Sequence, residues 1–212
     1  MTSDIIHRYK NGEPSDALGN AGLLVHMIEA GRLYQSEGEP WESGCSKGSW
    51  CGGIDHESCS LINHRHNGLF NHGVGLILSP GTRILCAFNW DNGLQGIPLG
   101  GCGRAQCRPD MWWDCSWPSN ELKAFMTSHE QHGLGRSRNY NEVVVTSKDW
   151  NDNLPEMIDA IVFGSDYGAK GAAQMVHRRF LKRFGGSVSH VPLLKMQLGN
   201  LDVPFVLAND IR

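Results

Sequence analysis

The sequence lacks the features of a membrane protein and of a disordered chain. None of its apolar runs approaches the ~20 residues that a membrane-spanning helix needs, and residues 1–16 lack the basic segment and apolar stretch of a signal peptide. The net charge is only −3 over 212 residues, of which 40% are hydrophobic, so the chain has enough apolar material for a core. We expect one folded domain, residues 1–212, with no membrane contact. The compartment stays open, because a trimmed secreted protein would show the same start.

The chain also lacks the basic excess that is typical of nucleic-acid-binding proteins, since it has 19 lysines and arginines against 22 acidic residues. Its dense basic cluster is His177-Arg178-Arg179 with Lys182-Arg183. This cluster falls at the end of a predicted helix, where cations interact favourably with the helix dipole. We interpret it as a solvated helix face, with a phosphate-binding patch as the alternative, and expect no nucleic-acid partner.

Cysteine, in contrast, is abundant and unevenly distributed. All seven cysteines, six of the seven tryptophans and half of the 26 glycines lie within residues 41–118. No two cysteines have the C-x-x-C spacing of zinc and redox motifs. Disulfides in an oxidising compartment and reduced, buried thiols both fit the pattern, and we expect Cys86, in an apolar run, to be a buried thiol. We predict a loop-rich, insertion-like region over 41–118.

Hydrophobic periodicity and turn residues predict a chain of mixed helices and strands. The clearest helix is 172–184, with further helices at 119–132 and around 23–29. Its predicted buried stripe is Met175, Val176, Phe180, Leu181 and Phe184. We predict strands at 4–9, 74–78, 83–88, 141–146, 191–198 and 203–207, a polar loop at 35–58, and either a strand or a helix end at 158–163.

Turn and proline positions refine the arrangement. Ser79-Pro80-Gly81-Thr82 has the central residues of a type II turn, so 74–78 and 83–88 are expected to form a hairpin. Pro192 and Pro204 favour sheet edges for the last two strands. Because strands and helices do not alternate regularly, we predict an α+β fold. It would have a central, mostly antiparallel sheet, two or three flanking helices and long Cys/Gly/Trp-rich loops.

Several patterns in region 41–118 have both a chemical and a structural interpretation. His64-x-His66, with His72 beyond, offers nitrogen ligands that zinc prefers, but exposed histidines are the common alternative, and we expect no metal. Cys102 lies among glycines whose backbone amides suit an oxyanion hole in a Cys/His hydrolase. Three tryptophans lie close together, Trp112, Trp113 and Trp117. They fit either stacking on a ligand or capping of the core.

A group of residues spread over the chain suggests NAD chemistry. Arg8 ends the predicted N-terminal strand, Ser58-Cys59-Ser60 precedes an apolar pair, and Glu142 begins the predicted strand 141–146. This order resembles the arginine–serine–glutamate pattern of the ADP-ribosyltransferases. Cys59 stands where the family usually has threonine, and Tyr140 stands where its arginine-modifying members have Glu or Gln.

The resemblance implies roles for these residues. Arg8 would contact the phosphates of NAD with Tyr140 also at the cofactor, Ser58 and Ser60 would brace the pocket, and Glu142 would hold the ribose. A carboxylate beside an oxocarbenium-like ribose stabilises the transition state. We therefore expect an enzyme that uses NAD as a substrate, for ADP-ribosyl transfer or NAD hydrolysis.

Two other interpretations of function stay open. One is a non-catalytic, disulfide-stapled binding or effector domain that recognises a glycan or a protein. The other is a Cys/His or metal-dependent hydrolase. The oligomeric state does not follow from the sequence.

Overall fold

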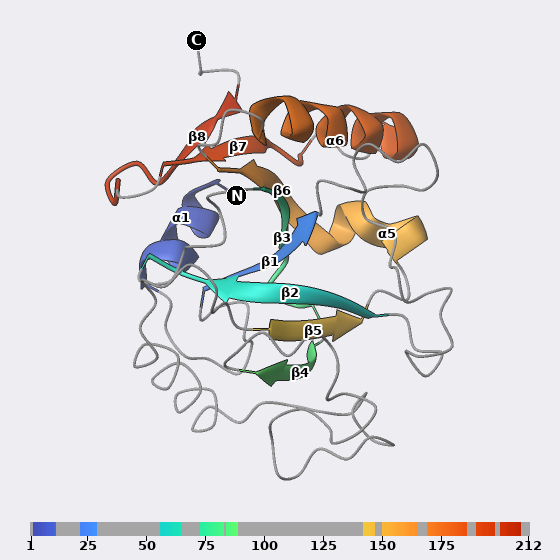
Figure 1. Cartoon of the computed structure of the whole chain (residues 1–212), viewed down its shortest axis with the longest axis horizontal. Coiled ribbons are helices and arrows are strands. Elements are labelled where there is room, and N and C mark those ends of the chain that lie inside the picture. The colour runs from blue at the N-terminus through green and yellow to red at the C-terminus, as the bar shows by residue number, and fades with distance from the viewer. Residues whose placement is uncertain are drawn as a thin grey trace.

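The computed structural model of the chain contains a mixed sheet with helices on both of its faces (Figure 1). It describes residues 2–11, 22–28, 56–64, 73–82, 84–88, 142–146, 150–164, 169–185, 190–197 and 200–208. At positions 56, 58, 84–88, 142, 144, 146 and 150–152 it describes the backbone alone. No helix within these ranges is long and apolar enough to cross a membrane.

The eight strands of the sheet lie in the order β4-β5-β2-β1-β3-β6-β7-β8. They are β1 (Leu23–Ile28), β2 (His56–Ile62), β3 (Val74–Leu78), β4 (Ile84–Phe88), β5 (Glu142–Thr146), β6 (Ile158–Phe163), β7 (Leu193–Met196) and β8 (Phe205–Leu207). All neighbouring strands are antiparallel except β6 and β7, which are parallel. The predicted α+β class with a mostly antiparallel sheet is confirmed.

The described helices are α1 (Thr2–Asn11), α5 (Trp150–Met157) and α6 (Ala169–Phe184). Helix α6 connects β6 to β7, because parallel strands cannot be joined by a tight turn and need a crossover. In Figure 1, α6 runs alongside the β6–β7 part of the sheet, whereas β4, β5 and β2 form the opposite part.

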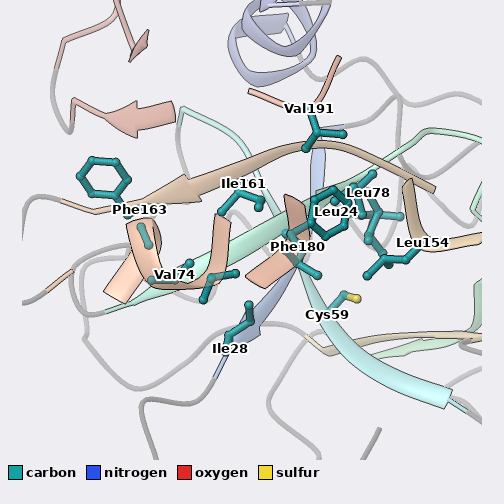
Figure 2. Close-up of a cluster of buried hydrophobic side chains, with 14 of the residues drawn as sticks. Leu24, Ile28, Cys59, Val74, Leu78, Leu154, Ile161, Phe163, Phe180 and Val191 are labelled. Atoms are coloured by element: carbon teal, nitrogen blue, oxygen red, sulfur yellow. The ribbon is translucent and has the colours of Figure 1, made fainter. Parts of the chain in front are cut away.

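The sheet separates two apolar clusters. On one face, Phe180 of α6 and Leu154 of α5 pack against the sheet (Figure 2), together with Leu24, Cys59, Ile161 and other buried side chains. On the other face, Ile5 and Tyr9 of α1 pack against Val25, Ile62, Ile77 and their neighbours. Burial on both faces explains why the central strands are apolar at almost every position.

Residues 4–9 belong to helix α1, so the predicted N-terminal strand is wrong. Ile5 and Tyr9 are buried one helical turn apart, while His7 between them is exposed. Asp4 lies in the first turn and Lys10 in the last, an order that complements the helix dipole. The helical spacing of the buried residues predicts this helix, whereas the short apolar run at residues 5–6 does not distinguish a helix from a strand.

Residues 23–28 form strand β1, so the helix predicted around 23–29 is wrong. This strand lies between β2 and β3, and five of its six residues are buried without alternation. A short, uniformly apolar run fits a buried strand and a helix equally well. A Cβ at Gly22 would lie 2.5 Å from the carbonyl oxygen of Ile62, so the close approach of β2 requires glycine there.

The strands β3 and β4 exist as predicted, but they do not form a hairpin. Strand β3 pairs with β1 and β6, whereas β4 pairs with β5 at the sheet edge. The turn itself is present, because Thr82 N donates to Ser79 O at 3.0 Å. Gly81 does not adopt a positive φ, so the turn is not type II. The chain leaves β3 and returns to the sheet four strands away.

The last third of the chain agrees best with the sequence. Helix α6 and strand β5 are confirmed, 158–163 is a strand, and Gly185, with φ of 65°, ends α6. Leu181 was placed wrongly in the buried stripe, because it is 40% exposed. Strand β8 lies at the predicted edge, but β7 is interior, since Pro192 precedes the strand and removes no hydrogen bond from its ladder.

Region 41–118 is not loop throughout, because it supplies three strands of the central sheet, β2, β3 and β4. Residues 56–58, predicted to end the 35–58 loop, begin β2. Cys86 lies in β4, where the backbone alone is described. The helix predicted at 119–132 lies outside the described residues.

Candidate functional site

The predicted serine segment and the predicted glutamate lie on hydrogen-bonded neighbouring strands. Ser58 and Ser60 belong to β2, and Glu142 begins β5. The register of β2 against β5 pairs Ser58 with Val144 and Cys59 with Val143. One step further along this antiparallel ladder, Ser60 stands opposite Glu142, and directly opposed residues have Cα atoms ~5 Å apart.

Strand alternation assigns these positions to a common face of the sheet. Cys59 and Val143 belong to the apolar cluster under α5 and α6, whereas Ile62, two residues beyond Ser60, belongs to the cluster under α1. Positions 58, 60 and 142 therefore fall on the α1 face. Ser60 is 2% exposed. This burial suits a side chain that positions a neighbouring residue and does not itself contact a ligand.

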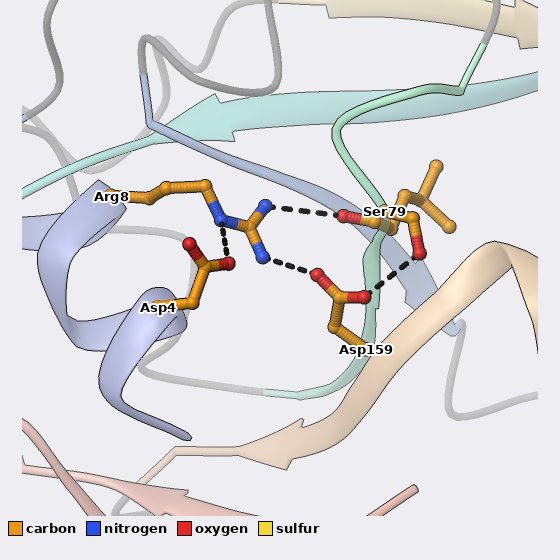
Figure 3. A network of polar contacts seen from close by, with 5 residues as sticks. Asp4, Arg8, Ser79 and Asp159 are labelled. Atoms are coloured by element: carbon orange, nitrogen blue, oxygen red, sulfur yellow. Dashed lines mark hydrogen bonds and ion pairs between the residues drawn. The ribbon is translucent and has the colours of Figure 1, made fainter. Parts of the chain in front are cut away.

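Arg8 lies in α1 on this same face, but its guanidinium is already engaged (Figure 3). Its Nε donates to Asp4 Oδ2 at 3.0 Å, its Nη1 lies 3.4 Å from the carbonyl oxygen of Leu78, and its Nη2 donates to Asp159. Ser79 Oγ donates to the other oxygen of Asp159 at 2.8 Å. Arg8 is 3% exposed, so the network fastens α1 to the adjoining interior strands β3 and β6.

The sequence reasoning missed a second polar pair, His26 of β1 and Glu57 of β2. Both are buried, at 6% and 7% exposure, and His26 Nδ1 lies 3.7 Å from Glu57 Oε2. Glu57 Oε1 is buried without a hydrogen-bond partner. The pair belongs to the face under α5 and α6, opposite to positions 58 and 60. A histidine within an apolar run and a glutamate just before Ser58 were the available signals.

Most of the other predicted site residues lie outside the described residues, namely Tyr140, Cys102, His66, His72 and the tryptophans of the 112–117 segment. His64 is described, and its backbone N donates to Tyr9 O at 3.0 Å, so it is tied to the end of α1. Among the described residues no group of three or more His, Cys, Asp or Glu side chains is placed to hold a metal.

No protein-family model matches the chain, and a search of curated proteins gives no match. Strands β2 and β5 provide a carboxylate position and two serine positions side by side, and Arg8 holds helix α1 on the same face of the sheet.

Proposed function

We propose that this chain catalyses ADP-ribosyl transfer from NAD, or hydrolysis of NAD, at the Ser58–Ser60 and Glu142 positions. The proposal rests on one observation: the pairing of β2 with β5. The segment 58–60 and Glu142 are far apart in the sequence, and the sheet topology makes them neighbours. If the serine and glutamate positions matched the family pattern only by chance, there would be no reason to expect them on neighbouring strands.

The reaction breaks the bond between the ribose C1′ and the nicotinamide nitrogen. The bonding electron pair leaves with nicotinamide, and positive charge develops on C1′ and the ring oxygen of ribose. A carboxylate at position 142 stabilises that charge, as a preorganised charge does at other glycosidic centres. Water or an acceptor nucleophile then forms the new bond to C1′ and loses a proton.

The serine positions support the carboxylate in this proposal. Ser60 is buried opposite Glu142, and Ser58 is its diagonal neighbour on the same face. Hydroxyl groups at these positions would hold a carboxylate in one orientation, and such preorganisation reduces the cost of reorganisation during reaction. Bracing of this kind fits a buried serine better than direct contact with substrate does.

Arg8 has a different part from the one that the resemblance implies. Asp4 and Asp159 already neutralise its guanidinium, and a phosphate would have to displace a carboxylate from a buried site. We assign Arg8 to positioning: it holds α1 over the face that carries positions 58, 60 and 142.

Thermal unfolding with and without ligand tests whether NAD binds. A ligand present at about 100 times its dissociation constant stabilises the folded state by about 2.7 kcal/mol, so NAD should raise the Tm by several degrees. ADP-ribose is the matched probe without nicotinamide, and ATP is the control for adenine and phosphates. An equal Tm with and without saturating NAD would contradict the proposal.

A further inference from the structure

Helix α6 carries a dense, one-signed charge. Its sequence contains Arg178, Arg179, Lys182 and Arg183 within two turns, and no aspartate or glutamate anywhere along its length. The chain as a whole has a net charge of −3. The basic cluster is therefore a local feature of this helix and does not reflect a basic composition.

These four cations form two adjoining rows, one opposite the buried side of the helix and one beside it. Arg178 and Lys182 are one turn apart, and so are Arg179 and Arg183. The buried side of α6 contains Ala169, Ala173, Val176 and Phe180, which places Arg178 and Lys182 opposite the core. Arg178, Lys182 and Arg183 are exposed, and Arg179 is partly buried.

Within the described part of the chain, none of the four cations forms an ion pair, and the ion pairs found there involve Arg8 and His26 instead. Arg178 Nε lies 3.4 Å from Gln174 O, and the guanidinium carbon of Arg183 lies 5.8 Å from the Phe184 ring centroid. Like charges one turn apart repel each other and destabilise a helix. The helix dipole offsets this for Lys182 and Arg183 in the last turn, but less for Arg178 and Arg179.

We infer that this basic face of α6, formed by Arg178, Arg179, Lys182 and Arg183, is a docking surface for an acidic segment of a protein. Three of the four residues are arginines, whose planar guanidinium binds carboxylates with two parallel hydrogen bonds. Their spacing matches acidic side chains one turn apart on a second helix. This inference does not depend on the NAD reaction, since α6 packs on the sheet face opposite to positions 58, 60 and 142.

The charge balance favours a protein over a nucleic acid. A nucleic acid extends its charge far beyond a patch of two turns, over a chain whose net charge of −3 gives no further attraction. Four cations neutralise few phosphates, so the salt-dependent affinity for a duplex stays low. A short acidic peptide places its charge against the patch alone.

Fluorescence anisotropy with a labelled poly-glutamate peptide tests the surface in the full chain. We expect binding that weakens as salt rises from about 50 mM to about 200 mM, and an affinity lowered about tenfold or more by the double variant R178E/K182E. The matched control is K10E/K170E, which makes the same change in net charge away from the patch. That control should retain the wild-type affinity within about twofold.

Absence of peptide binding by the wild-type chain would overturn the inference. Equal losses of affinity in both double variants would overturn it as well, because only the overall charge of the chain would then matter. Tighter binding of a DNA duplex than of poly-glutamate would also overturn it and indicate a nucleic-acid surface. Circular dichroism establishes that the variants are folded, and R178Q/K182Q provides a milder pair, expected to lose affinity in the same direction.

Discussion

Arg8 of helix α1 and Asp159 of strand β6 form an ion pair although 151 positions separate them in the sequence. The arginine side chain is 3% exposed and the aspartate 20%. The same guanidinium reaches Asp4 within its own helix and the carbonyl of Leu78 at the end of β3. One side chain thus fixes the helix to two strands of the sheet.

Replacing Arg8 with methionine should therefore destabilise the chain. The substitution keeps the apolar stem but leaves Asp159 partly buried with only Ser79 Oγ as a described donor. We expect a loss of about 2–3 kcal/mol in the free energy of unfolding, measured by urea denaturation. Lys10→Met, at a partly exposed position of the same helix, removes only the 3.3 Å contact with Asp202 O and should change it by less than about 1 kcal/mol.

Arg8→Lys separates the two roles considered for this residue. Lysine keeps the charge but not the three-way geometry, so a positioning role predicts a lower Tm. A raised KM for NAD at an unchanged Tm would instead favour direct contact of Arg8 with NAD phosphate.

Gly75 of β3 is expected to tolerate no side chain. A Cβ there would lie 2.5 Å from Val25 Cγ1 and 3.1 Å from Met27 Sδ. Gly75→Ala should therefore cost about 1–3 kcal/mol, because overpacking forces neighbouring side chains to move. Gly81→Ala is the control, since nothing lies within 4 Å of its added Cβ and its φ is not left-handed. Equal Tm values for the two variants would contradict this packing.

Much of the fold followed from local patterns, and the errors have physical causes. Helix α6 has a full amphipathic period and a glycine stop, and β5 is a run of β-branched residues, so both were predictable. Strand β1 is uniformly apolar, which hides its period. The pairing of β4 with β5 instead of β3 is a long-range choice that a turn between β3 and β4 does not decide.

The candidate site shows the same division. Ser58, Ser60 and Glu142 could be named from the sequence, but their proximity depends on the pairing of β2 with β5. Arg8 could be named as well, yet its partner Asp159 lies in a strand that the sequence left open between two structures. The His26–Glu57 pair had no motif to reveal it, because it forms only when β1 and β2 join.

The buried His26–Glu57 pair should behave as a coupled unit. Replacing either residue alone with leucine leaves the other polar group buried, so each single variant should lose about 1–3 kcal/mol of stability. The double variant H26L/E57L should be at least as stable as the less damaged single variant, because both polar groups are removed together. A double-mutant cycle from chemical denaturation measures this coupling. Strictly additive losses would contradict it.

Ser60→Ala and Ser79→Ala form a matched pair for separating stability from activity. Each removes one hydroxyl group from the folded chain, and we expect a cost of about 1 kcal/mol for each in chemical denaturation. Only Ser60 lies at the proposed site, so S60A should lower kcat/KM for NAD about tenfold or more, while S79A should stay near the wild-type value. Similar activity in both variants would remove the bracing role of Ser60.

The rate of nicotinamide release from NAD, compared between the wild-type chain and Glu142→Gln, tests the central claim most directly. The amide has the same shape but no charge to stabilise the developing oxocarbenium ion, so the rate should fall by a factor of about 100–1,000. Glu156→Gln, at an exposed position of α5, is the control and should keep the wild-type rate. Release of nicotinamide by E142Q at the wild-type rate, or no release by the wild-type chain at saturating NAD, would contradict the assignment.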